Sequence, residues 1–106
     1  MDLELNAEQS GSHCRLSIRG ELCIYDAAEL KPKLLGYLAQ SSALEVNLAD
    51  VNEIDCAGFQ LLYLLKREAV SEGKKLHLVN HSQASLEMLG LLNMEAYFGD
   101  PLVLAS

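Results

Sequence analysis

The residues with the most evident chemical potential stand together at positions 47–58, which read NLADVNEIDCAG. The pattern predicts the end of a strand, an acidic loop over 50–55 and the start of a helix. Asp55 is placed to cap that helix, and a carboxylate there also interacts favourably with the helix dipole. The free amides of a helix start can hold an anion. The segment therefore predicts either a binding site or a cap with a purely structural role.

Cys56 follows this aspartate, and a thiol at a helix start suggests two kinds of chemistry. A redox-sensitive thiol needs a lowered pKa, which the helix N-terminus favours and the adjacent Asp55 opposes. A catalytic thiol needs an imidazole within hydrogen-bond reach and an oxyanion hole. His77 and His81 could supply only the imidazole. Both chemistries are therefore minor alternatives to an unreactive thiol at the start of the helix.

The cysteines and histidines together predict no metal site, no cofactor and no disulfide framework. The three cysteines are an odd number and contain no Cys-x-x-Cys spacing. The three histidines have no carboxylate at ligand spacing on a shared element, so we expect them singly at the surface. The cysteines other than Cys56 are expected to be small buried apolar residues. The three histidines are His13, His77 and His81, and the two cysteines expected to be buried are Cys14 and Cys23.

The elements that position the 47–58 segment follow from hydrophobic periodicity. Alternating side chains predict strands over 3–5 and 14–18, paired as a hairpin, and further strands over 44–48, 76–79 and 101–104. Apolar spacings of three and four predict helices over 26–40, over 57–71 and from Ser82 onward, with another helical turn over 94–98. Asp26 and Glu29 fit a capping box for the first helix, although Pro32 follows inside it. Gly73 suits the left-handed position that ends the second helix.

The order of these elements predicts a small α/β sandwich. Two strands come first, and strand and helix then alternate. The sheet is therefore expected to be mixed and mostly parallel, with four to five strands. The helices are expected to pack mainly on one face. Residues 1–106 are expected to form a single domain, because the length suits one core and no linker or repeat interrupts it.

Composition excludes several classes of partner. The chain has 106 residues, of which 50% are hydrophobic, and a formal charge of −7. Nucleic acids and anionic membrane surfaces both require clustered positive charge, which this balance opposes. No apolar run approaches the ~20 residues that cross a bilayer, and the N-terminus lacks a secretory leader pattern. We therefore expect a cytoplasmic protein with no nucleic-acid partner and no direct membrane insertion.

Several short motifs together resemble one family. The run Ile-Asp-Cys-Ala-Gly-Phe over 54–59, with Asp50 before it and a leucine-rich helix after it, resembles the signature of STAS domains. Gly-Glu-Leu over 20–22 resembles the family's Gly-Glu-Leu-Asp at the end of the second strand. Ala-Glu-Leu over 28–30 resembles the start of its first helix. The match extends from the first strand to Leu89 with the same order of elements. The chain is therefore similar to a family that includes the anti-sigma-factor antagonists.

This resemblance implies a binding switch without catalysis of its own. In the antagonists, the serine after the motif aspartate is phosphorylated by a partner anti-sigma kinase, and the unphosphorylated form binds that kinase. On this chain the aspartate is Asp55 and the phospho-acceptor position is Cys56. Ala57 replaces the next hydroxyl, and Cys23 replaces the aspartate of Gly-Glu-Leu-Asp. Because a thiol is not a substrate for a serine/threonine kinase, we expect the binding surface to survive and its phospho-regulation to be lost or altered.

The partner-binding surface is expected around the start of the second predicted helix. The expected partner is an anti-sigma-type kinase or another regulatory protein, with a basic surface that complements the acidic loop. The resemblance also reaches the small cytoplasmic partners of phospholipid-transport ATPases, so a constitutive scaffold subunit is the alternative. No oligomeric state is predicted. The residues assigned to the surface are Glu21, Asp50, Glu53, Asp55, Cys56, Ala57, Gly58 and Gln60.

Overall fold

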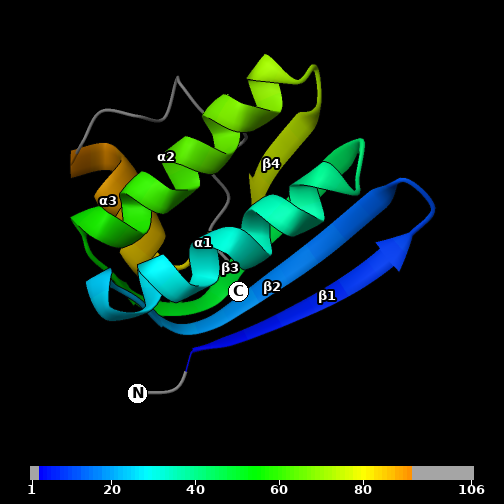
Figure 1. Cartoon of the computed structure of the whole chain (residues 1–106). Coiled ribbons are helices and arrows are strands. Elements are labelled where there is room, and N and C mark those ends of the chain that lie inside the picture. Colours follow the sequence, from blue (N-terminus) through cyan, green and yellow to red (C-terminus); the bar gives the residue numbers. More distant parts are fainter. Residues whose placement is uncertain (1–2, 92–106) are drawn as a thin grey trace.

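A computed structural model describes residues 3–91 of the chain, without the side chains of Ile24, Tyr25 and Leu91. The described part is an α/β fold with a four-stranded sheet and three helices (Figure 1). The helical turn predicted over 94–98 and the strand predicted over 101–104 lie outside the described residues. Within residues 3–91, no helix is long and apolar enough to span a bilayer.

The sheet is mixed, as the element order predicts, and its strands lie side by side in chain order. Strand β1 (Glu4–Ser10) pairs antiparallel with β2 (His13–Leu22), which confirms the predicted hairpin. β2 pairs parallel with β3 (Ala43–Ile54), and β3 pairs parallel with β4 (Lys75–Val79). The parallel strands therefore end at the same edge of the sheet, where helix α2 (Cys56–Ser71) begins.

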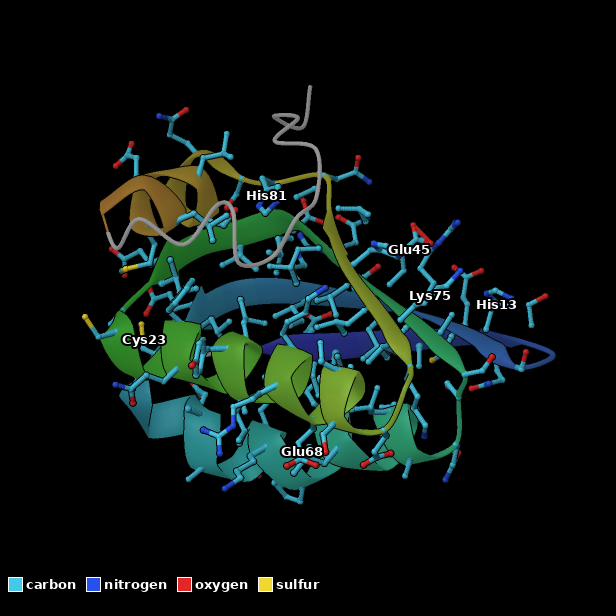
Figure 2. All side chains as sticks on the ribbon, turned by 90° about the horizontal axis from the view of Figure 1, so that it is seen from above. His13, Cys23, Glu45, Glu68, Lys75 and His81 are labelled. Carbon is cyan, nitrogen blue, oxygen red and sulfur yellow. The ribbon has the colours of Figure 1, made fainter. Side chains whose placement is uncertain are left out.

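Two of the helices cover one face of this sheet. Helices α1 (Ile24–Ala39) and α2 pack against each other and against the strands (Figure 1). Helix α3 (Gln83–Leu91) packs against β3, and in Figure 2 it lies on the other side of that strand. The leucine stripes of α1 and α2 face the core, as their spacing predicts. The largest fully buried side chains are Leu16, Ile18, Leu22, Leu34, Leu38, Leu44, Leu48, Leu62, Leu65, Leu76, Leu78 and Leu89.

The predicted capping box at the start of α1 is wrong. The helix already begins at Ile24, with Cys23 at the N-cap position and no side-chain cap hydrogen bond. The Cys23 carbonyl accepts hydrogen bonds from the amides of Asp26 and Ala27, so Asp26 lies within the first turn. Its carboxylate there still interacts favourably with the helix dipole.

The acidic segment over 50–55 is not the loop that the sequence predicts. β3 continues through it as far as Ile54, because two irregularities in its pairing with β2 let both strands extend together. Such β-bulges bend a strand and are common beside functional sites. Val51 is fully buried and anchors this part of β3 in the core. The acidic side chains of the segment are therefore held on the end of a strand.

Candidate functional site

Asp55 joins the end of β3 to the start of α2. Its Oδ1 accepts a hydrogen bond of 2.8 Å from the Gly58 amide, and its carbonyl accepts one of 2.9 Å from the Phe59 amide. The predicted N-cap is therefore confirmed, and it satisfies an amide of the first turn that has no partner within the helix. The Asp55 amide in turn donates to the Leu22 carbonyl at 3.3 Å. Asp55 thus ties α2 to the end of β2 as well as to β3.

Gly58 lets the first turn of α2 lie directly against the end of β2. The residue is buried, and a Cβ built on it would overlap the carbonyl oxygen of Leu22 and lie 2.8 Å from its carbonyl carbon. Any side chain at residue 58 would therefore force the strand and the helix apart. The close backbone approach expected at Gly58 is present, and the backbone that approaches it belongs to Leu22.

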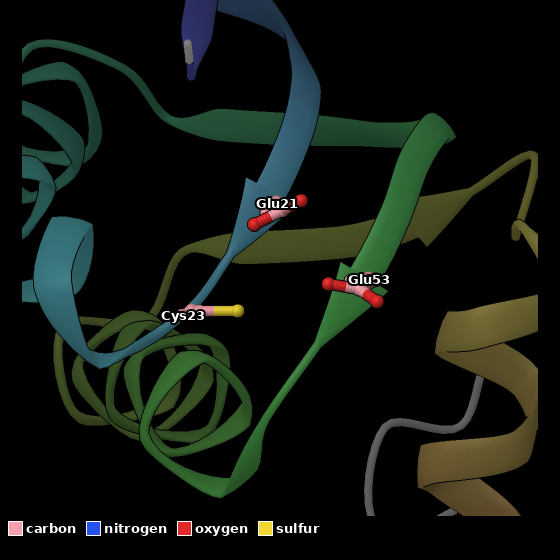
Figure 3. A group of neighbouring side chains, drawn as sticks. All are labelled: Glu21, Cys23 and Glu53. Atoms are coloured by element: carbon pink, nitrogen blue, oxygen red, sulfur yellow. The ribbon is translucent and has the colours of Figure 1, made fainter. Parts of the chain in front are cut away.

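Glu21 and Glu53 face each other across the ends of β2 and β3. They are direct partners in the parallel register, just after the second pairing irregularity. Figure 3 shows the two side chains on neighbouring strands. Like charges directly opposite each other in a sheet are destabilising. The salt bridges of the described residues involve neither carboxylate, so this part of the chain leaves the repulsion in place.

Cys23 joins this acidic pair from the N-cap position of α1. Its Sγ and one carboxylate oxygen each of Glu21 and Glu53 all lie within 4.8 Å of one another (Figure 3). Desolvation raises the pKa of the Cys23 thiol above its ordinary value, and the nearby carboxylates of Asp55, Glu21 and Glu53 raise it further. The thiol is therefore protonated at neutral pH and is a poor nucleophile.

The same three groups are the only set within residues 3–91 that could offer three ligand atoms to a metal ion. Zinc binds thiolate and carboxylate ligands, and the cysteine must lose its proton first. The raised pKa of Cys23 opposes that loss. A cation at this place would be attracted by the Glu21 and Glu53 carboxylates and would have to displace the proton of Cys23.

An open hollow of about 350 Å³ lies beside this group, between the end of β3 and α3. Only the part of its lining that comes from α3 lies outside the contact surface that the sequence predicts, which spans 21–25 and 50–60. Cys23 directly follows β2 as Asp55 directly follows β3, and the two residues are close because parallel strands end at the same edge of the sheet. The hollow is lined by Cys23, Asn52, Glu53, Ile54, Asp55, Ala84, Glu87 and Met88.

The other residues assigned to the surface differ in their placement. Cys56 and Gln60 are exposed near the start of α2, and Ala57 is half-buried. Asp50 is exposed further back along β3, opposite Arg19 on β2, where unlike charges attract. Asp50 is therefore a neighbour of the Glu21–Glu53 pair and not a member of it.

The histidines form no thiol–imidazole pair with Cys56. His13 and His77 are exposed, as predicted, and each lies on a strand. The surface position predicted for His81 is wrong, since only 1% of the residue is exposed. Its Nδ1 lies 3.1 Å from Ser85 Oγ in the first turn of α3, and this contact compensates for its burial. Cys56 is exposed to solvent, whereas His81 is enclosed.

Nearly the whole chain matches one protein family. Residues 5–104 fit the family model described as "Mlab, STAS domain". This chain belongs to the STAS domain family. The resemblance carried by the motifs at 20–22 and 54–59 is thereby confirmed, and so is the α/β fold it implies.

This STAS domain is similar to anti-sigma factor antagonists in sequence and in fold. The anti-sigma-B factor antagonist of Bacillus subtilis (strain 168) is 23% identical to it over 95 residues, which are 90% of this chain and 87% of the relative. An anti-sigma factor antagonist from Mycobacterium paratuberculosis superposes with a TM-score of 0.83 at 18% identity, over 97% of this chain and 88% of that one. The Bacillus cell fate determinant SpoIIAA in its phosphorylated form has a TM-score of 0.72 at 16% identity, over 92% and 91%. The structural matches establish the shared fold.

Proposed function

We propose that this STAS domain is a regulatory protein-binding module of the antagonist kind, without catalysis of its own. Its binding surface lies where β2 and β3 end and α2 begins, and is called the cap surface below. The observation that carries the proposal is the pair of adjacent carboxylates on Glu21 and Glu53, which form no salt bridge within residues 3–91. The cap surface consists of Glu21, Asp50, Glu53, Asp55, Cys56, Ala57, Gly58 and Gln60.

The cap surface suits a partner with a basic surface. An arginine or lysine of the partner placed between Glu21 and Glu53 would turn their repulsion into charge-assisted hydrogen bonds. The formal charge of −7 adds a long-range attraction that speeds the encounter with such a partner. The hydrogen bond from Gly58 to Asp55 and the contact with Leu22 hold the surface rigid before binding.

Cys56 is at the centre of the proposed regulation. It is the first residue of α2 and is exposed. The motif resemblance at 54–59 aligns it with the serine that is phosphorylated in the antagonists. A phosphate there would add about −1.5 to −2 charges and change how an acidic surface meets its partner. Neither Cys56 nor Ala57 offers a hydroxyl group. We therefore propose that the partner-binding surface is kept while the phospho-switch is lost or altered.

The second candidate function is a constitutive scaffold subunit of an ATPase complex of the phospholipid-transport type. The missing hydroxyls at Cys56 and Ala57 favour it, because a scaffold needs a contact surface and no switch. The two candidates share the cap surface and differ in their partner. Co-purification separates them: an ATPase bound in stoichiometric amount supports the scaffold, and a histidine-kinase-like ATP-binding protein supports the switch module.

Capture of partners from the native cell by the tagged full chain tests the proposal. Glu53→Lys and Gln60→Lys place a positive charge on the cap surface, where we expect each to abolish capture. Glu29→Lys places the same charge on an exposed position of α1 and is the matched control, expected to capture the partner like the wild type. Equal capture by all three variants would contradict the proposal.

A further inference from the structure

Strand β1 forms an open edge of the sheet. It is the outermost strand beside β2, and within residues 3–91 no strand pairs with its other side (Figure 1). Its pairing with β2 runs from Glu4 to Ser10 without a register shift. Proteins commonly block a free edge with a lysine, a proline or a bulge, and β1 has none of these. The edge can therefore accept a further strand.

The geometry of the hairpin determines which backbone groups of β1 point outward. Gly11 has a φ of 62° at the first position of the two-residue turn, so Ser10 and His13 form the hydrogen-bonded pair that closes the hairpin. Along an antiparallel ladder, hydrogen-bonded and non-hydrogen-bonded pairs alternate. The residues of β1 whose amide and carbonyl groups point away from β2 are therefore Leu5, Ala7 and Gln9.

An apolar hollow accompanies this edge. It has a volume of about 460 Å³ and lies between the start of β1 and α1, where Leu3, Leu5 and Leu30 contribute to its lining. Leu5 is paired with the buried Ile18, so its side chain lies on the face of the sheet that α1 covers. Leu3 and Leu5 pack against the core but are only partly buried. A second chain at the edge would remove more of their apolar surface from water.

The sequence of β1 is complementary to itself in one antiparallel register. A two-fold axis through Leu5, perpendicular to the sheet, places Leu5 beside the second copy's Leu5 and Leu3 beside the second copy's Ala7. Both pairs lie on the face towards α1. On the opposite face, Glu4 lies beside the second copy's Asn6, so no like charges meet within residues 3–7. The outward-pointing backbone groups of Leu5 and Ala7 are the ones that this register needs for its hydrogen bonds.

The neighbouring registers match less well. An axis through Asn6 sets Glu4 against the second copy's Glu8, and like charges in such positions destabilise a sheet. An axis through Ala7 sets Leu5 against the polar Gln9. The axis through Leu5 is the one of the three that joins apolar side chains to each other. It also brings the two hollows together, because Leu5 lines the hollow of each copy.

We propose that β1 pairs with β1 of a second copy, which gives a homodimer with one continuous sheet. Both copies use the same patch, so the assembly closes at a dimer. Helix α1 packs mainly on β2 and β3 and leaves the edge accessible. The association is weak, because edge pairing buries little area and each copy carries a formal charge of −7. Residues 3–7 share no member with the cap surface, so the dimer is separate from the proposed partner binding.

Sedimentation velocity of the full chain, up to millimolar concentration, tests the dimer. The wild type is expected to shift from monomer towards dimer as the concentration rises. Added salt should move this shift to lower concentration, because it screens the repulsion between two acidic copies. A wild type that stays monomeric throughout, at low and at high salt, would overturn the proposal.

Ala7→Pro removes an outward-pointing amide from the junction. Proline is tolerated on an edge strand where the missing amide faces away from the neighbouring strand, so the pairing with β2 is kept. We expect association to weaken at least about tenfold. Gln9→Pro is the matched control, because its amide also points outward but lies beyond the residues that pair with the second copy. It should associate like the wild type, and equal association of the two variants would overturn the proposal.

Amide hydrogen exchange of the wild type locates the junction even if a proline variant fails to fold. The amides of Leu5 and Ala7 are expected to exchange severalfold more slowly at a concentration where the dimer prevails than in dilute solution. The amide of Gln9 should exchange at the same rate in both. Unchanged exchange at Leu5 and Ala7, or an equal slowing at all three amides, would overturn the proposal.

Discussion

The carbonyl group of Leu22 lies against the Cα of Gly58 so closely that a Cβ on residue 58 would overlap its oxygen. The same Leu22 oxygen accepts a hydrogen bond from the Asp55 amide. The last residue of β2 therefore contacts both the cap and the first turn of α2. This arrangement fixes how Glu21, which precedes Leu22 in β2, lies relative to Cys56, which is the first residue of α2.

Gly58→Ala is expected to destabilise the fold by about 1–3 kcal/mol, because the added methyl group overpacks a site occupied by backbone. The helix propensity of alanine, better than that of glycine by about 1 kcal/mol, works against this cost and is too small to cancel it at the upper end. Denaturant unfolding followed by circular dichroism measures the difference. The variant is also expected to bind the partner less well, since the cap surface must shift.

Gly36→Ala is the matched control for that substitution. Gly36 also lies in a helix, but a Cβ there would meet nothing within 4 Å. The same change should therefore stabilise the protein by roughly 0.5–1 kcal/mol through helix propensity alone. Equal effects of the two substitutions, in sign and size, would show that the Leu22 contact does not constrain residue 58.

Asp55→Ala is expected to cost about 0.5–2 kcal/mol of stability, because the Gly58 amide loses its acceptor. Asp55→Asn keeps a side-chain oxygen at the same place and should cost much less, since asparagine caps helices about as well as aspartate. The midpoints of thermal unfolding of the two variants give the comparison. If both lose the same stability, the negative charge of Asp55 matters and the hydrogen bond does not.

Much of the fold could be predicted because its signals are local. The alternation around Leu16 and Ile18 predicts a strand, the leucine stripe of α2 predicts its buried face, and Asp55 predicts the cap. Gly73 after α2 has a φ of 71°, the left-handed conformation expected of a helix-ending glycine. Each of these features depends on residues a few positions apart in the chain.

The features that could not be predicted depend on distant parts of the chain. The extension of β3 to Ile54 requires β2 beside it and two pairing irregularities, which no local pattern reveals. The contact between Glu21 and Glu53 depends on the same register. The burial of His81 depends on the turn into α3, where Ser85 provides a polar contact for the imidazole. The early start of α1 could not be predicted either. Its N-cap residue, Cys23, forms no side-chain cap hydrogen bond, so no capping residue type marks the start of the helix.

Glu53→Gln is expected to stabilise the fold by roughly 0.2–1 kcal/mol, because it removes one charge of a repulsive cross-strand pair. Asp50→Asn on the same strand is the control. It removes a charge that faces Arg19, and should leave stability unchanged or lower it slightly. Urea unfolding at low ionic strength shows the difference most clearly, since salt screens both effects. A loss of stability in Glu53→Gln would mean that the Glu21–Glu53 contact is not repulsive.

The thiol of Cys23 is expected to react slowly with iodoacetamide at neutral pH and to react faster only above the ordinary thiol range. Desolvation and the carboxylates of Asp55, Glu21 and Glu53 raise its pKa in the folded state. The unfolded chain then ionises first, so the stability contributed by the neutral thiol is present below the unfolded pKa of about 9 and is lost as the pH rises through the higher folded value. Alkylation against pH, resolved by peptide mass, gives the folded pKa. Rapid labelling of Cys23 at pH 7 would contradict this assignment.

The most direct test of the proposed function is the affinity of the captured partner for the double variant Glu21→Gln, Glu53→Gln, measured by calorimetry beside the wild type. Both glutamines keep the shape of the cap surface and remove only its paired charges. We expect the variant to be more stable than the wild type and to bind its partner at least about tenfold more weakly, with a smaller dependence on salt. An unchanged affinity, in a variant that is folded and more stable, would contradict the claim that this carboxylate pair recognises the partner.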